Sequence, residues 1–323
     1  MADGVILSVV IPFYNGIEDV VALVEHLNSD DGRFEVVLVN DGSTVCSGEK
    51  LAAKFSDYDN VTLASYDDNR GVSTARNEGI RIAHGEYIWM VDADDHVTQT
   101  DVLRAVEWIE KTNGKFDALF FDWASEPSRQ SAQPIRAIEF SKDDALRRVY
   151  ERDGYVWDKI FRRQTIVGND ILFDEQLFWA EDKLFCAQFL ASSTDGLYLT
   201  SSVLYCHVKR GTSFTGSKKV DTKRLTLIDS KRQLLELSKG LQVEGLTETA
   251  QADLISDALM LLFRLIKQRP NGWRECWKKY WAVISSYREG YLKNQALLPK
   301  YRLFLRFCPG IDFILRKTKE VAA

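Results

Sequence analysis

Short apolar segments alternate with helix-like segments through the first 123 residues, and this alternation restricts the possible folds most strongly. The apolar segments are rich in β-branched or aromatic residues and end in turn residues, which predicts strands. They cover 5–12, 34–40, 61–66, 87–92 and 116–123, with helix-like segments at 18–28, 48–55, 72–83 and 101–112. Strands joined by helices make right-handed crossovers, so we expect an α/β fold, a mostly parallel sheet with helices on both faces.

The remainder of the chain divides into two parts. Residues 124–216 show a less regular pattern, whereas 221–239, 247–268, 273–292 and 299–318 have helical periodicity. The stretch "RPNGW" at 269–273 should break two of these helices. We therefore expect an α/β domain over residues 1–216 and a helical C-terminal region over residues 217–323.

Composition is typical of a soluble globular protein, with 45% hydrophobic and 28% charged residues in a chain of 323. The five cysteines form no CxxC pair, which favours reduced thiols. The apolar run at 5–13 has no basic flank and contains a proline, so it is too short for a secretory signal or a membrane span. These features predict a cytoplasmic protein.

The positive charge is concentrated at the C-terminal end. Residues 264–320 hold fourteen Lys or Arg against four Asp or Glu, although the net charge of the chain is −5. Within this region, apolar residues recur at helical spacing among three cations. The apolar residues are Leu298, Tyr301, Leu305 and Cys308, and the cations are Lys300, Arg302 and Arg306. Such a segment can lie on the anionic cytoplasmic face of an inner membrane. A packed C-terminal helix or a contact with a second copy in a homo-oligomer explains the pattern equally well.

Polar residues follow four of the predicted strands. They are "PFYN", "NDGST", "DDNRGVSTARN" and "DADDH". In a parallel sheet, ligands bind beyond the carboxyl ends of the strands, so these four loops should converge on one site.

The stretch "VDADDHV" at 91–97 carries the strongest chemical signal. Mg²⁺ and Mn²⁺ prefer oxygen ligands and are often held by one or two carboxylates while phosphate oxygens complete the shell. Asp92 and Asp94, two positions apart at a strand end, suit this role. The alternative is a strand stop followed by a helix N-cap, for which Asp is also favoured.

Two further loops suit a nucleotide. Asp41 can accept hydrogen bonds from a nucleobase or ribose, although "NDGS" is also an ordinary turn sequence. The helix that begins after Gly71 has Arg70 and Arg76 nearby, and a helix start of this kind attracts phosphate. A solvated basic helix start is the alternative.

In "FWAEDKLF" at 178–185, Glu181 and Asp182 stand beside aromatic residues at a predicted helix start. A shielded carboxylate there can take a proton from an incoming hydroxyl, or the two acids can simply complement the helix dipole. The chain has no GxxxxGK[ST] phosphate loop, no GxSxG elbow and no GxGxxG after the first strand. P-loop enzymes and dinucleotide-dependent oxidoreductases are therefore poorly supported, and no nucleic-acid partner is expected.

Together these motifs resemble the family-two glycosyltransferases of the GT-A fold. The resemblance covers about residues 5–215 and is to bacterial members that build capsule, lipopolysaccharide or other surface polysaccharides. It is carried, in this order, by "SVVIPFYN", "EVVLVNDGST", "NRGVSTARNEGI", "GEYIWMVDADD", "YVWDKIFRR" and "WAEDKLF". Many relatives have two acids where this chain has Asn40 and Asp41.

The resemblance implies an inverting, metal-dependent transferase that moves a sugar from a nucleotide-diphosphate sugar, most simply a UDP-sugar, to a saccharide or lipid-linked acceptor. It implies Asp182, with Glu181, as the catalytic base, and Asp94, Asp92 and His207 as ligands of Mn²⁺ or Mg²⁺. The nucleotide-sugar site would comprise Pro12, Tyr14, Asn15, Asp41, Arg70, Gly71, Arg76, Asp92 and Arg210. A metal-dependent nucleotidyltransferase and a non-catalytic sugar-nucleotide-binding protein remain as alternatives.

Overall fold

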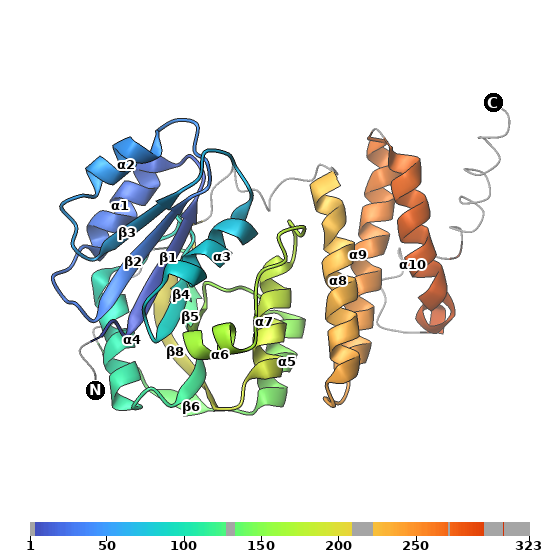
Figure 1. Cartoon of the computed structure of the whole chain (residues 1–323). Coiled ribbons are helices and arrows are strands. Elements are labelled where there is room, and N and C mark those ends of the chain that lie inside the picture. The colour runs from blue at the N-terminus through green and yellow to red at the C-terminus, as the bar shows by residue number, and fades with distance from the viewer. Residues whose placement is uncertain (1–3, 127–132, 209–221, 271, 294–305, 307–323) are drawn as a thin grey trace. The chain divides into compact units, whose positions relative to one another are not determined.

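The computed structural model describes residues 4–126, 133–208, 222–270, 272–293 and 306. Within these ranges eight strands form one sheet in the order β3-β2-β1-β4-β7-β5-β8-β6 (Figure 1). The β4–β7, β7–β5 and β8–β6 pairs are antiparallel and the other pairs are parallel. Six strands therefore share one direction, which confirms the predicted mostly parallel sheet. The strands are β1 (Leu7–Phe13), β2 (Phe34–Asn40), β3 (Val61–Ser65), β4 (Tyr87–Met90), β5 (Phe116–Ala124), β6 (Ala137–Glu139), β7 (Lys159–Arg162) and β8 (Gly196–Cys206).

Helices flank this sheet, as the alternating pattern predicts. They are α1 (Ile17–Leu27), α2 (Gly48–Lys54), α3 (Val72–Ile82), α4 (Gln99–Lys111), α5 (Lys142–Glu151), α6 (Arg163–Gly168) and α7 (Glu181–Ser192). The four helices predicted in the first half, which became α1 to α4, differ from these bounds by at most two residues at either end.

Both faces of β1 are covered, because alternate side chains of a strand point to opposite sides. On one side, Val9 and Ile11 lie in a core cluster with Leu23 of α1. On the other side, Val10 meets α3 at Gly79, where an added Cβ would lie 2.2 Å from Val10 Cγ1. The missing side chain lets α3 lie close to the sheet. Each fully buried Val or Leu contributes about 1.5–3 kcal/mol relative to an exposed one.

The strand order reverses beside β1. The chain adds β2 and β3 on one side of β1 and then crosses to β4 on the other side. In open α/β sheets such a reversal opens a crevice at the carboxyl ends of the strands, where ligands bind. The loops after β1, β2 and β4 therefore meet at this edge.

The region expected to be less regular, 124–216, contains six elements in its described part, from β6 to β8. The four-residue β7 is inserted antiparallel between β4 and β5, and β8 then runs parallel to β5. The three-residue β6 and the four-residue β7 are too short to show a clear period-2 pattern, so the sequence did not reveal them.

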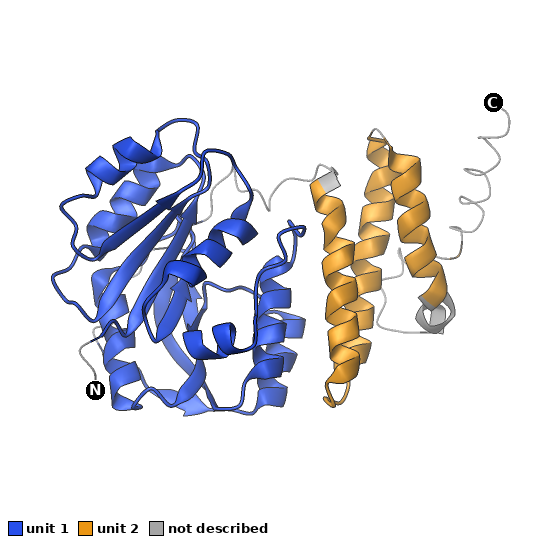
Figure 2. Ribbon diagram, in the orientation of Figure 1, with its two compact units in different colours: residues 1–214 blue, residues 215–323 orange. Residues whose placement is uncertain are grey.

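The chain divides into two compact units, residues 1–214 and 215–323 (Figure 2). The second unit contains α8 (Thr222–Gly240), α9 (Leu246–Gln268) and α10 (Trp273–Lys293). Leu254, Ala258 and Leu261 of α9 are buried. No helix in the described part of the chain is long and apolar enough to cross a membrane. The helix expected at 299–318 lies outside the described residues, except for Arg306, which is helical and exposed.

Candidate functional site

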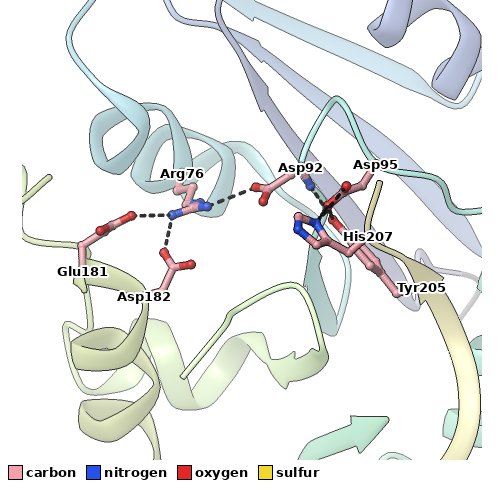
Figure 3. A network of polar contacts seen from close by, with 7 residues as sticks. All are labelled: Arg76, Asp92, Asp95, Glu181, Asp182, Tyr205 and His207. Carbon is pink, nitrogen blue, oxygen red and sulfur yellow. Dashed lines mark hydrogen bonds and ion pairs between the residues drawn. The ribbon is translucent and has the colours of Figure 1, made fainter. Parts of the chain in front are cut away.

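Arg76, from α3, lies at the centre of a cluster of three carboxylates (Figure 3). Its Nη1 donates to Asp182 Oδ1 and to Glu181 Oε1 at 3.3 Å, and its Nη2 donates to Asp92 Oδ1 at 3.2 Å. Asp92 follows β4, whereas Glu181 and Asp182 begin α7. One buried guanidinium thus joins the end of the fourth strand to the start of a helix about 90 residues later in the sequence.

The charges in this cluster do not balance, because one cation faces three acids. Burial raises the pKa of Asp182, and the carboxylate of Glu181 raises it further, although Arg76 lowers it. Burial likewise raises the pKa of Asp92 against the lowering effect of Arg76. Burial alone would lower the pKa of Arg76, but Asp182, Asp92 and Glu181 together raise it above its ordinary value. Arg76 therefore stays charged, while Asp182 and Asp92 are easier to protonate than usual.

The first turn of α7 holds its two acids after a strained residue. Ala180, the N-cap, has φ 58°, in the left-handed region. For a residue with a Cβ this conformation costs roughly 1–2 kcal/mol. Phe178 and Trp179 just before it are half-buried. Their shielding of the two acids stays a prediction.

A second polar chain connects the β4 loop to β8. The Asp92 N–H donates to Tyr205 Oη at 3.1 Å, and Tyr205 Oη donates to Asp95 Oδ2 at 2.6 Å. Asp95 Oδ1 lies 3.1 Å from His207 Nδ1 and accepts from the Val208 N–H at 2.8 Å. Burial raises the pKa of Asp95, although the hydrogen bonds from Tyr205, His207 and Val208 lower it. Asp95, which had no predicted role, is thus the residue that fixes this loop.

This contact also orients His207, a predicted metal ligand. An ionised carboxylate only accepts hydrogen bonds, so Asp95 favours the tautomer with its proton on Nδ1 and leaves Nε2 as an acceptor. The imidazole also stacks on Trp157, with ring centroids 5.5 Å apart and an angle of 9°. Arg210, which was predicted to belong to the nucleotide-sugar site, lies outside the described residues.

Asp41 ties the loop after β2 to the start of α3. Its Oδ1 accepts from the Arg70 N–H at 2.7 Å, and its Oδ2 accepts from the Gly71 N–H and from Asn69 Nδ2, both at 2.9 Å. Asp41 is buried, and Gly42 leaves no room for a Cβ against the backbone of residues 68 and 69. The predicted nucleotide-contacting acid is therefore largely engaged in positioning the Arg70–Gly71 backbone. Its role toward a nucleobase stays a prediction.

The loop after β1 is fastened to the loop after β2. The Asn15 N–H donates to Ser43 Oγ at 2.8 Å, and Asn15 Oδ1 accepts from the Thr44 N–H at 3.0 Å. Asn15 has φ 57°, a value that Asn tolerates better than most residues. Tyr14 beside it is exposed. Pro12 is buried, and it follows the part of β1 that pairs with β4. The structure thus brings these three predicted residues to the same edge as Asp41.

The predicted metal ligands lie around the β4 loop without forming a complete site. Asp94 is exposed, Asp92 bonds Arg76, and His207 bonds Asp95. Among the described residues, no three His, Cys, Asp or Glu side chains are grouped so that they could hold a metal ion. A site that shares its cation with a diphosphate needs only one or two protein carboxylates.

Three contributors to the site were missed from the sequence: Asp95, Tyr205 and Trp157. Tyr205 and His207 are two positions apart at the end of a strand, a spacing that places both on one side. The alternation in "LYCHV" could therefore have placed Tyr205 on the same side as His207 and so in the site. Nothing local in "YVWDK" shows that Trp157 stacks on Tyr205, with ring centroids 4.8 Å apart.

Comparison with known proteins gives three findings. Residues 8–167 match the model of the family described as glycosyl transferase family 2. A protein named as the uncharacterized glycosyltransferase EpsJ, from Bacillus subtilis (strain 168), is 31% identical over 195 residues. That match covers 56% of this chain and 54% of EpsJ, so the chain spans about half the length of this relative.

The third finding is a likeness to solved structures. S. aureus TarS residues 1–349, in complex with UDP-GlcNAc, matches with a TM-score of 0.66 and 22% identity, covering 96% of this chain and 89% of that one. The mannosyltransferase PcManGT from Pyrobaculum calidifontis, in complex with GDP-Man and Mn²⁺, matches with a TM-score of 0.53 and 15% identity, covering 98% and 86%. At these identities the likeness shows the fold, and it confirms the predicted GT-A architecture.

Proposed function

Because residues 8–167 belong to glycosyl transferase family 2, we propose that the chain is an inverting glycosyltransferase. It moves a sugar from a nucleotide-diphosphate sugar, a UDP-hexose or UDP-N-acetylhexosamine, to a hydroxyl of a saccharide or lipid-linked acceptor. The product is part of a cell-surface polysaccharide. The reaction takes place in the cytoplasm or at the cytoplasmic face of the inner membrane.

One observation carries this proposal: Arg76 joins Asp182 to Asp92. It holds a candidate base beside the strand end where the donor should bind. The two carboxylates are far apart in the sequence. If Asp182 served only to cap its helix, it would not need to be joined to Asp92 through Arg76.

In this reaction Asp182 takes the proton of the acceptor hydroxyl while that oxygen attacks the anomeric carbon opposite the leaving diphosphate. A single displacement of this kind inverts the centre. A base works best when its pKa lies near the working pH. Burial raises the pKa of Asp182 in this direction, and Arg76 keeps the carboxylate oriented and limits the rise.

The donor side is assigned to the loops after β1, β2 and β4. Tyr14 and Asn15 border the nucleotide, and the Arg70–Gly71 backbone, positioned by Asp41, lies at the start of α3 near the phosphates. TarS, which shares the fold, was solved with UDP-GlcNAc, and this supports a UDP-sugar as donor.

A divalent cation suits the same place. Asp94 is exposed directly after β4 and, with Asp92, supplies hard oxygen ligands, while His207 presents Nε2. The excess of acids over Arg76 also favours an added positive charge. When bound, Mn²⁺ or Mg²⁺ would offset the charge of the leaving diphosphate. PcManGT, solved with Mn²⁺, supports this assignment.

The test is to incubate the full chain with UDP-glucose, UDP-galactose, UDP-GlcNAc, UDP-GalNAc and GDP-mannose, with and without manganese. We expect at least one UDP-sugar to bind in calorimetry and to release free UDP. Release of pyrophosphate from nucleoside triphosphate and sugar phosphate would instead identify a nucleotidyltransferase. Binding without release on addition of saccharide acceptors would identify a non-catalytic binding protein.

A further inference from the structure

Three aromatic side chains of the first unit are unusually exposed and lie at the carboxyl edge of the sheet. Tyr14 is 49% exposed, Trp123 40% and Tyr155 46%. Tyr14 follows β1 and belongs to the proposed donor side. Trp123 lies near the end of β5, and Tyr155 precedes β7, which runs antiparallel, so its start also lies at this edge. The proposed donor site does not use Trp123 or Tyr155.

These two rings are the outer members of an ordered aromatic group. Tyr155 stacks on Trp157 with centroids 4.7 Å apart and an angle of 19°. Trp157, only 4% exposed, stacks in turn on His207. Trp123 meets Trp157 edge to face at 5.3 Å and His207 at 6.0 Å. Both exposed rings therefore rest on the buried ring of Trp157, which holds their surfaces in place.

A buried cation, Lys159, holds the loop that carries Tyr155 in place. Lys159 Nζ donates to the carbonyl oxygens of Asp153 and Tyr155, both at 2.7 Å, and to the Asp158 carboxylate. The Lys159 side chain is fully buried. Burying an ammonium group costs several kcal/mol unless it is paired and hydrogen-bonded, as it is here. These hydrogen bonds restrict the motion of the loop, as a loop that presents a binding surface requires.

The same loop lies beside the candidate base. Cys186 Sγ is 3.4 Å from the Tyr155 carbonyl oxygen, and Cys186 follows Asp182 by four residues on α7. Residues four apart share one face of a helix, about one turn apart. An added Cβ on Gly154 would lie 2.8 Å from Lys183 Cγ, so the loop is also pressed against the first turn of α7.

Trp123 is directed by an irregularity in β5. The pairing of β5 with β8 shifts register between Phe120 and Asp122 and again between Asp122 and Trp123. Bulges of this kind change the direction of a side chain and are frequent next to active sites. In the sheet order β1-β4-β7-β5, three strand spacings, about 14 Å, separate Trp123's strand from that of Tyr14. A nucleobase held near Tyr14 is therefore too far away to lie on the ring of Trp123.

We infer that Tyr155 and Trp123 form the platform on which a pyranose ring of the acceptor stacks, with its hydroxyl directed to Asp182. This inference rests on the proposed function. A pyranose has an apolar C–H face and a rim of hydroxyls. The exposed aromatic surface matches the face, and the nearby carboxylates of α7 match the rim.

The test uses saturation-transfer NMR on the full chain with saturating UDP and manganese. The probes are the methyl β-glycosides of glucose, galactose and N-acetylglucosamine at millimolar concentration. We expect saturation to concentrate on the C–H protons of one ring face for at least one probe. Tyr155→Ala should weaken that probe's affinity at least five-fold, whereas Tyr155→Phe, which keeps the ring, should retain it. Trp123→Ala should weaken it as well.

Leu172→Ala, at another exposed apolar position of the same unit, is the matched control and should not alter probe binding. Circular dichroism of each variant checks that it folds. Equal probe saturation in wild type and Tyr155→Ala, including none in either, would overturn the inference. So would a loss of UDP affinity in Tyr155→Ala, since the ring would then belong to the donor site. Failure of the wild type to bind any UDP-sugar in calorimetry would instead refute the proposed function.

Discussion

Arg76 donates a hydrogen bond to Asp182 across 106 residues of sequence. This bond fixes the position of the first turn of α7 relative to α3. Because the same guanidinium also bonds Asp92, the base candidate and the strand end cannot move independently. The same cluster therefore contributes both to the proposed reaction and to the stability of the fold. Different substitutions within it should affect one of these properties more than the other.

Asp182→Asn should keep donor binding and abolish transfer. The amide has nearly the same shape but cannot accept the hydroxyl proton, and loss of a general base costs typically 10²–10⁴-fold in rate. UDP affinity by calorimetry and UDP release with acceptor should be measured side by side. Asp170→Asn, an exposed position outside the site, is the control. Transfer within a few-fold of wild type would reject Asp182 as the base.

Glu181→Gln should shift the acidic limb of the pH–rate profile toward lower pH. Asp182 must be ionised to act, so activity falls as the pH drops through its pKa. Glu181 raises that pKa in the wild type, so a neutral side chain lowers it and extends activity to more acidic conditions. The profile of kcat/KM between pH 5 and 9 measures this. A limb that stays in place or moves to higher pH contradicts the arrangement.

Arg76→Met should destabilise the first unit strongly at pH 8. Removing one partner of a buried ion pair costs about 3–5 kcal/mol because the other charges stay buried. The loss should shrink toward pH 5.5. Arg76 lowers the folded-state pKa values of Asp92 and Asp182 against the effect of burial, so its removal lets both rise further. The folded variant then gains more stability than the wild type from proton binding as the pH falls.

Urea unfolding at the two pH values measures this difference. Arg81→Met, which removes an exposed partner of Glu78, is the matched control and should change stability little at either pH. An Arg76→Met loss that is the same at pH 8 and pH 5.5 would mean that the carboxylates are not its cause.

Asp94→Ala should remove the manganese dependence of UDP binding without unfolding the protein, because the side chain is exposed. In the wild type, EDTA should weaken UDP binding, and manganese should restore it. In the variant, UDP affinity should be low and equal with EDTA and with manganese. Calorimetry that shows the wild-type response to manganese in the variant would exclude Asp94 as a ligand.

Asp41→Asn should loosen the turn before α3. The carboxylate accepts from three donors, and an amide must direct its NH₂ group at one or more of them. A buried donor left without an acceptor costs about 1–3 kcal/mol. We expect faster hydrogen exchange at the Arg70 and Gly71 amides, together with weaker UDP binding. Unchanged exchange at both amides would contradict this account.

Local patterns in the sequence predicted the parallel half of the sheet well. In β1, β2 and β4 every residue is buried because both faces are covered, so these segments are mostly apolar, and turn residues follow each strand. The convergence of Asn15, Asp41 and Asp92 at one edge followed from topology alone. The roles assigned to these residues stay predictions, because geometry shows where side chains lie and not what they bind.

The antiparallel insertion and its contacts were beyond the reach of such patterns. β7 has only four residues, and its place between β4 and β5 depends on pairing that no local signal encodes. Asp95 looks like its neighbours in "DADD", yet it is buried and accepts a hydrogen bond from Tyr205, which is 110 residues away in the sequence. Likewise, the burial of Lys159 depends on three acceptors that only the folded chain brings together.

The contact of Asp95 with Tyr205 and His207 has a consequence for the order of events during synthesis. Residues 87–97 leave the ribosome long before residues 205–208, and His96 pairs with Cys206 in an isolated β-bridge. Until β8 emerges, the Asp95 carboxylate lacks these partners, and β5 lacks its parallel neighbour. The β4 loop is translated early but is completed only when β8 emerges. A nascent chain that stops at residue 167 would carry the whole segment that matches the family model without a finished donor loop.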